Sequence, residues 1–172
     1  ALYAEGATQD GHALTQAFAR EQRNAFEVTQ RLQQTVSATP AQSPAAITSA
    51  FAPLTRDGSL NGALAQQLFQ VAKLIAARDA VGGDRQIFFA QLGGFDTHGG
   101  QVSSDDVLGG QHAELLKQLG DAMAAFQQAM SNLGMADQVT TFTESDFGRT
   151  LAPNDSMGSD HAWGNHHLVL GG

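Results

Sequence analysis

The 172-residue sequence contains no cysteine, a single tryptophan and only nine lysine and arginine residues. Without cysteine, the chain cannot form a disulfide, bind zinc through thiolates or use a cysteine nucleophile. The few basic residues face 17 aspartates and glutamates, which gives a net charge of −8. Because nucleic-acid phosphates are bound by basic surfaces, this charge argues against a nucleic-acid partner. The negative charge does not exclude a small anionic substrate, since a bound metal ion reverses the local field.

Long apolar runs and several common enzyme motifs are also missing. No stretch approaches the roughly 20 apolar residues of a membrane-spanning helix, so we expect no membrane span. The sequence holds no G-x-S-x-G elbow, Walker loop, G-x-G-x-x-G turn or H-E-x-x-H helix. The usual serine hydrolases, nucleotide-binding enzymes and zinc proteases therefore lack their signatures here. With 42% hydrophobic residues, the chain is nevertheless long enough for one domain with a core.

Apolar residues recur every three or four positions in three stretches, a spacing that predicts amphipathic helices. The helices are expected over residues 12–36, 60–80 and 108–133. Residues 37–58 hold three of the four prolines, so we expect a connector there, with a short helical turn near 47–51.

Three short stretches have the apolar or β-branched character of strands, at residues 86–92, 139–143 and 167–170. Helices that alternate with strands are typical of an α/β fold, so we predict a mostly parallel sheet with helices on both faces. We divide the chain into an N-terminal helical segment with its Pro-rich connector, 1–58, and an α/β core, 59–172. Loops that follow parallel strands meet at one edge of the sheet, where open α/β proteins place their sites.

Carboxylates and imidazoles gather in three glycine-punctuated loops beside these strands. The loops read GGFDTHGGQ (93–101), TFTESDFGRT (141–150) and GSDHAWGNHH (158–167). Carboxylate oxygens and imidazole nitrogens are the ligands of divalent metal ions such as zinc and manganese. The candidate metal ligands are Asp96, His98, Asp146, Asp160, His161 and His166.

Each of these motifs also has a structural interpretation. Asp96 can cap a turn beside a surface histidine, and an isolated Asp-His pair such as 160–161 is more often structural than functional. Strand alternation places Glu144 and Asp146 on one side, where they can bind a metal or serve as acid and base. Asp146 can equally pair with Arg149. Arg149 can clamp an anion, although a lone arginine is more often structural.

Three elements of the sequence, GGFDTH (93–98), SDFGRT (145–150) and DHAWGNHH (160–167), occur together in a known family. In this combination the chain resembles DUF1501, a bacterial family of exported proteins of unknown function that is generally placed in the alkaline phosphatase and sulfatase superfamily. The resemblance implies an alkaline phosphatase-like, largely parallel sheet that binds one or two divalent metals at its strand ends. It also implies an exported protein, periplasmic or extracellular.

The resemblance assigns roles to particular residues. Asp96 and His98 look like the superfamily's Asp/His ligand pair, and Ser145-Asp146-Phe147-Gly148 looks like its S-D-H-G signature. His161 or His166 looks like its last histidine ligand. Phe147 departs from the pattern, because the superfamily has a ligand histidine at this place. Asp160 and His161 would then have to compensate, or the site holds only one metal.

The resemblance also bears on the extent of the chain. The superfamily's nucleophile lies near the start of its domain, on a segment that this sequence does not identify, and members of the family continue beyond the final Gly-Gly. We therefore expect an internal fragment of a longer protein. The consecutive apolar residues 168–170 are expected to form a strand buried on both faces inside the sheet.

The function that follows is a metal-dependent hydrolase of phosphate or sulfate esters, which would act on a small anionic ester. The ion would be zinc, manganese, magnesium or calcium, and Arg149 would contact the anion. In this hypothesis Asp96, His98, Asp146 and His161 converge in space. The alternative is an exported binding or structural protein that kept the scaffold without catalysis.

Overall fold

The structure is a computed structural model that describes residues 13–81, 85–106 and 108–172. Helices account for most of its regular structure: α2 (Ala13–Ser37), α3 (Ala45–Phe51), α4 (Ala63–Ala76), α5 (Arg78–Val81) and α6 (Gln111–Asn132), with short 3-10 helices η1 (Pro40–Gln42), η2 (Ala52–Leu54) and η3 (Ala136–Gln138). The strands are β1 (Thr55–Arg56), β2 (Ser59–Leu60), β3 (Thr140–Phe142), β4 (Gly148–Arg149), β5 (His161–Ala162) and β6 (Val169–Gly171). Among the described residues, no helix combines the length and the apolar character needed to cross a membrane.

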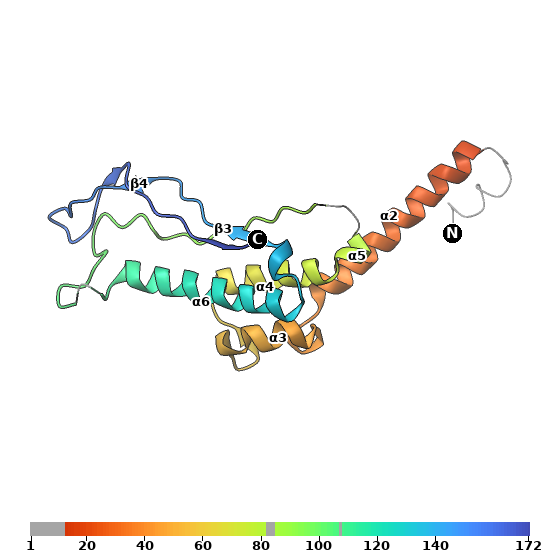
Figure 1. Cartoon of the computed structure of the whole chain (residues 1–172), viewed down its shortest axis with the longest axis horizontal. Helices are drawn as coiled ribbons and strands as arrows, with labels where there is room; N and C mark the ends of the chain where they lie inside the picture. Colours follow the sequence, from red (N-terminus) through yellow and green to blue (C-terminus); the bar gives the residue numbers. More distant parts are fainter. Residues whose placement is uncertain (1–12, 82–84, 107) are drawn as a thin grey trace.

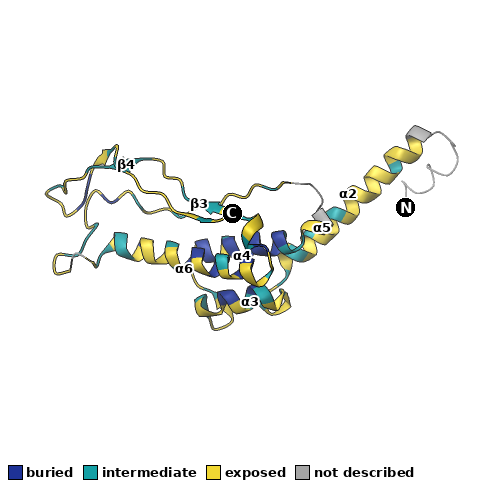
Figure 2. Ribbon diagram, viewed as in Figure 1, coloured by how far each residue is buried: buried dark blue, intermediate teal, exposed yellow. Residues whose placement is uncertain are grey.

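The hydrophobic core lies where α3, α4 and α6 pack together (Figures 1 and 2). Ile47 and Phe51 of α3 and Met130 of α6 are completely buried. The Phe51 ring meets Phe69 of α4 edge-on, with centroids 5.3 Å apart. Such aromatic contacts add about 0.5–1.5 kcal/mol to the burial of the rings. The helices predicted from apolar spacing are thus confirmed, including the short one inside the connector, although α4 ends earlier than expected and α6 begins after Gly110.

Helix α2 projects away from this core (Figure 1), and Phe18 and Phe26 on it are exposed. Its C-terminal end is held by Lys73 of α4. Lys73 is 2% exposed, and its ammonium donates to the carbonyl oxygens of Val36, at 2.9 Å, and Ala38, at 2.8 Å. The last carbonyls of a helix have no partner within it and carry the negative end of the helix dipole. The buried ammonium therefore supplies both a hydrogen-bond donor and a positive charge at this end of the helix. Burial lowers the pKa of Lys73.

The predicted mostly parallel sheet with helices on both faces is wrong. The described strands form three separate two-stranded antiparallel pairs, β1 with β2, β3 with β6, and β4 with β5. Parallel strands need a crossover connection, usually a helix. Between β3 and β6, however, the chain contains only loops and the β4–β5 pair. The chain therefore returns to β3 in the opposite direction, and an antiparallel ladder results.

The strand expected at residues 86–92 forms no ladder within the described part of the chain. The Gln67 side chain of α4 takes the place of a neighbouring strand. Its amide oxygen accepts from the Gln91 N–H, and its amide nitrogen donates to the Gln91 carbonyl oxygen, each at 2.9 Å. Burial alternates over the last four residues of this stretch. Ala90 and Leu92 pack against the core, whereas Phe89 is 84% exposed.

The apolar run at residues 168–170 does form a strand, but the expected burial on both faces is wrong. Leu168 and Val169 are exposed and only Leu170 is half-buried. Pairing with β3 alone covers one edge of this strand. Consecutive apolar residues are therefore no proof of a central position in a sheet.

Replacing Lys73 tests the anchor of α2. We expect Lys73→Met to lower the free energy of unfolding by about 1–3 kcal/mol, because two helix-end carbonyls lose their donor. Urea unfolding followed by circular dichroism measures the change. Lys117→Met is the matched control, since Lys117 lies exposed on α6 beside Asp121 and such pairs contribute at most about 1 kcal/mol. Equal effects of the two substitutions would contradict the anchoring role.

The same lysine predicts a pH dependence. Burial lowers the pKa of Lys73 below its usual 10.5, so at alkaline pH this lysine is protonated to a greater extent in the unfolded chain than in the folded chain. Its contribution to the free energy of unfolding therefore rises as the pH increases toward 10.5. We expect this rise in the wild-type protein and a smaller one in Lys73→Met, measured by urea unfolding at increasing pH. Parallel curves for the two proteins would refute it.

Candidate metal centre

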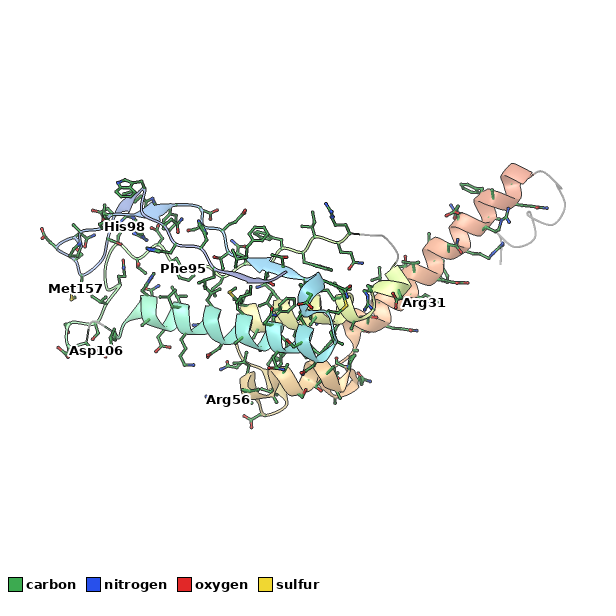
Figure 3. All side chains as sticks on the ribbon, in the orientation of Figure 1. Arg31, Arg56, Phe95, His98, Asp106 and Met157 are labelled. Atoms are coloured by element: carbon green, nitrogen blue, oxygen red, sulfur yellow. The ribbon has the colours of Figure 1, made fainter. Side chains whose placement is uncertain are left out.

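Two loops and the β4–β5 pair converge at the end of the molecule opposite to the projecting α2, where His98 and Phe95 lie (Figure 3). Pairing of β4 with β5 sets Arg149 opposite His161. The loop before β5 then rests on the first loop, because the Ser159 N–H donates to the Thr97 carbonyl oxygen at 3.3 Å. Gly158 permits this approach, since a Cβ there would lie 2.3 Å from the His98 carbonyl group.

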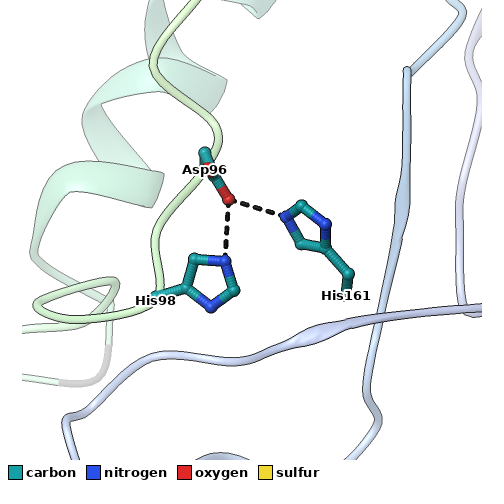
Figure 4. Close-up of side chains that lie close together, drawn as sticks. All are labelled: Asp96, His98 and His161. Atoms are coloured by element: carbon teal, nitrogen blue, oxygen red, sulfur yellow. Dashed lines mark hydrogen bonds and ion pairs between the residues drawn. The ribbon is translucent and has the colours of Figure 1, made fainter.

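The side chains of Asp96, His98 and His161 meet at this convergence (Figure 4). One carboxylate oxygen, Asp96 Oδ1, lies 2.7 Å from His161 Nε2 and 3.1 Å from His98 Nε2. One ligand atom from each of the three residues falls within 4.8 Å of the others. All three side chains are about half exposed. The structure thus contains a possible metal-binding triad of one carboxylate and two imidazoles that solvent can reach.

A second carboxylate lies behind His98. His98 Nδ1 is 3.0 Å from Asp160 Oδ1, which also accepts from the Asn154 amide at 3.1 Å. His98 therefore stands between two carboxylates. A neutral imidazole has one N–H, so it can donate to only one of them, and the other nitrogen then turns a lone pair toward an anionic oxygen. Both contacts are satisfied by a protonated imidazole or by a metal ion on Nε2.

The histidines also act on the carboxylates. The hydrogen bond from His161, with the charges of His98, His161 and Arg149, lowers the pKa of Asp96 below its usual range. The hydrogen bonds from His98 and Asn154 lower the pKa of Asp160 in the same way. Both carboxylates are therefore ionised at neutral pH, the form in which they bind or orient a cation.

Arg149 links the loops of the triad through hydrogen bonds. Its guanidinium donates to the carbonyl oxygen of Phe95 at 2.6 Å, to the carbonyl oxygen of Ser159 and to Asp96 Oδ1 at 3.2 Å. The side chain is only 18% exposed. These bonds join the loops that carry the three candidate ligands, so Arg149 holds the site together in this structure. Its expected contact with a bound anion stays a prediction.

Phe147 and Asn154 contribute contacts that sequence analysis did not foresee. The Phe147 ring stacks on the His161 ring, with centroids 4.1 Å apart and planes 12° apart. Asn154 organises the loop before Gly158, because its side-chain oxygen accepts from the N–H groups of Ser156 and Gly158. An asparagine that precedes a glycine-containing turn is a recognised turn signal, which would have drawn attention to Asn154. No sequence signal foretells the stacking.

Two of the candidate ligands lie apart from the triad. Asp146 and His166 are exposed, and neither belongs to a metal-sized group among the described residues. The donor set of two nitrogens and one oxygen fits a borderline divalent ion, and the position of His98 between two carboxylates favours a cation there. The residues present therefore fit a metal ion, with Asp160 in the supporting position behind His98.

Replacing Arg149 tests whether its hydrogen bonds hold the loops of the site together. We expect Arg149→Met to speed amide exchange at Ser159 and Asp160 and to lower the free energy of unfolding of this region by about 2–3 kcal/mol, because bonds to a charged donor are lost. Arg149→Lys should recover only part of this, since an ammonium cannot reproduce the planar fork of donors. Arg31→Met, on the exposed face of α2, is the control. Exchange rates unchanged by Arg149→Met would contradict this role of Arg149.

Comparison with known proteins gives a single assignment. The family model described as "Protein of unknown function (DUF1501)" matches residues 5–172, nearly the whole chain. No curated protein and no solved structure matches this chain. The match includes all three loops of the candidate site. The chain therefore belongs to the DUF1501 family.

Proposed function

We propose that Asp96, His98 and His161 bind one divalent metal ion in a metal-dependent hydrolase of phosphate or sulfate esters. The observation that carries the proposal is the position of His98 between the carboxylates of Asp96 and Asp160, at 3.1 and 3.0 Å. A second imidazole on the same oxygen of Asp96 completes a compact donor set. Three protein ligands leave positions on the ion for water and substrate.

Each residue has a distinct task in this site. Asp96 would offer a carboxylate oxygen, and His98 and His161 would offer Nε2. Asp160 would accept the Nδ1–H of His98, which fixes the tautomer with its lone pair on Nε2. When bound, the ion supplies a Lewis acid that polarises an ester oxygen. Because the three ligand side chains are about half exposed, a small anionic ester can reach them from solution.

The donor set also bears on the identity of the ion. Magnesium and calcium prefer all-oxygen sites, whereas imidazole nitrogen suits zinc and other transition metals. Among the four ions considered, zinc and manganese are therefore favoured over magnesium and calcium. The alkaline phosphatase and sulfatase relationship is part of the proposal and is supported by the motifs around Asp96, Asp146 and His161. An exported location is likewise proposed, from the resemblance to exported proteins.

A second candidate is an exported binding or structural protein without catalysis. It is favoured by Arg149, whose bonds to Phe95, Ser159 and Asp96 occupy the guanidinium that an anionic substrate would need. In that case the ion would cross-link the two loops and do no chemistry. The two candidates differ in one measurable respect, because only the hydrolase turns over an ester.

Metal binding and its pH dependence test the site. We expect zinc and manganese to bind near neutral pH in isothermal calorimetry, and magnesium and calcium to bind more weakly. His98→Ala and His161→Ala should each lower zinc affinity at least about 100-fold, and Asp160→Asn about 10-fold. Affinity should fall from about pH 8 to about pH 5, because imidazole binds metal only as the neutral base.

The control is His166→Ala, since His166 is an exposed histidine outside the triad. Its zinc affinity should equal that of the wild type. Hydrolysis of an aryl phosphate and an aryl sulfate by the zinc- and manganese-loaded protein then separates the two candidates. Absence of any metal binding would remove the hydrolase proposal, and binding without turnover would leave the second candidate.

A further inference from the structure

The ring of Phe147 has a defined place beside the triad. Arg149 pairs opposite His161 in the β4–β5 ladder, so Phe147, two residues before Arg149, lies on the same face and diagonal to His161. Diagonal neighbours are within reach of aromatic side chains. The two rings are nearly parallel, 12° apart, with centroids separated by 4.1 Å. The Arg149 guanidinium also approaches this ring, 4.9 Å from its centroid.

Stacking on Phe147 restricts the rotation of the His161 ring. The histidine is about half exposed, and its ring can turn about the bond to Cβ unless something holds it. Phe147 covers a face of the imidazole, which keeps the ring plane in an orientation that points Nε2 at Asp96 Oδ1, 2.7 Å away. His98 contacts the same imidazole at a centroid distance of 4.9 Å. The ring therefore rests among aromatic neighbours and has its ligand atom directed at the carboxylate.

The chemistry of the pair favours an aromatic partner over an aliphatic one. An imidazole becomes electron-poor when it donates its lone pair to a metal ion. The negative face of a benzene ring attracts an electron-poor or cationic group. Leucine fills a similar volume but offers no such face. An aromatic ring at this position therefore both orients the ligand and stabilises its metal-bound form.

We propose that Phe147 is a positioning residue that presents His161 to the metal ion through face-to-face stacking. The proposal rests on the proposed metal site and adds a residue to it that offers no ligand atom of its own. It also explains how a chain with phenylalanine at this position can retain a site. The ring acts on the orientation of an existing ligand, and no ligand from position 147 is required.

Three variants test the proposal. Phe147→Leu removes the aromatic face, Phe147→Tyr keeps it, and Phe142→Leu is the control on β3, where the phenylalanine is exposed and stands outside the triad. Circular dichroism first confirms that each variant is folded. Two properties are then measured: the proton NMR shifts of the His161 ring in the metal-free protein, assigned with His161→Gln, and the zinc affinity by calorimetry.

We expect the His161 ring protons to be shifted upfield in the wild type and in Phe147→Tyr, and to lose this shift in Phe147→Leu. Zinc affinity should fall about 10-fold in Phe147→Leu and change less than about 2-fold in the other two variants. Unchanged affinity in Phe147→Leu would overturn the proposal, as would an equal loss in Phe147→Tyr. If Phe147→Leu does not fold, the comparison of Phe147→Tyr with Phe147→Met decides in the same way.

The outcomes also separate this inference from the proposed function. A wild-type protein that binds no zinc overturns both. Zinc binding that is insensitive to Phe147→Leu overturns only the positioning role. Zinc binding that depends on Phe147 without ester hydrolysis supports the positioning role and contradicts only the hydrolase.

Discussion

One carboxylate oxygen, Asp96 Oδ1, is the shared hydrogen-bond acceptor of the candidate site. It lies within 3.2 Å of His161, His98 and Arg149, which reach it from its own loop and from the β4–β5 pair. A single anionic oxygen can accept from several donors at once, and the hydrogen bond from His161, with the charges around it, lowers the pKa of Asp96. The arrangement depends on this oxygen because the surrounding chain has little regular structure to fix it. The same oxygen is the natural first ligand for a cation.

The helices supply the support that the loops lack. The Gln111 side chain, at the start of α6, donates to the Gly94 carbonyl oxygen at 3.1 Å, and the His112 N–H donates to the Gln101 carbonyl oxygen at 3.1 Å. These bonds join both ends of the loop that carries Asp96 and His98 to one helix. Helix α6 in turn is part of the buried core with α3 and α4. The loop of the triad is therefore anchored to a helix of the core, although the triad residues are exposed.

Some features of the candidate site can be predicted from the sequence, and others cannot. Glycines beside Asp96-Thr97-His98 and around Asp160-His161 indicate tight loops, and aspartate with histidine indicates metal chemistry, so these residues are recognisable as candidates. Asp146 and His166 carry the same chemistry but stand apart from the triad. The stacking of Phe147 on His161 has no sequence signature, because it depends on the register of the β4–β5 pair.

The sequence alone specifies the helices, since apolar spacing at three and four residues is a local property, and α2, α4 and α6 lie where that spacing predicts. It also determined the supply of carboxylate and imidazole ligands. The tertiary structure sets how the strands pair, because pairing joins residues far apart in the chain and local strand character specifies neither partner nor direction. For the same reason it alone decided that His98 stands between Asp96 and Asp160 and that Phe147 covers His161.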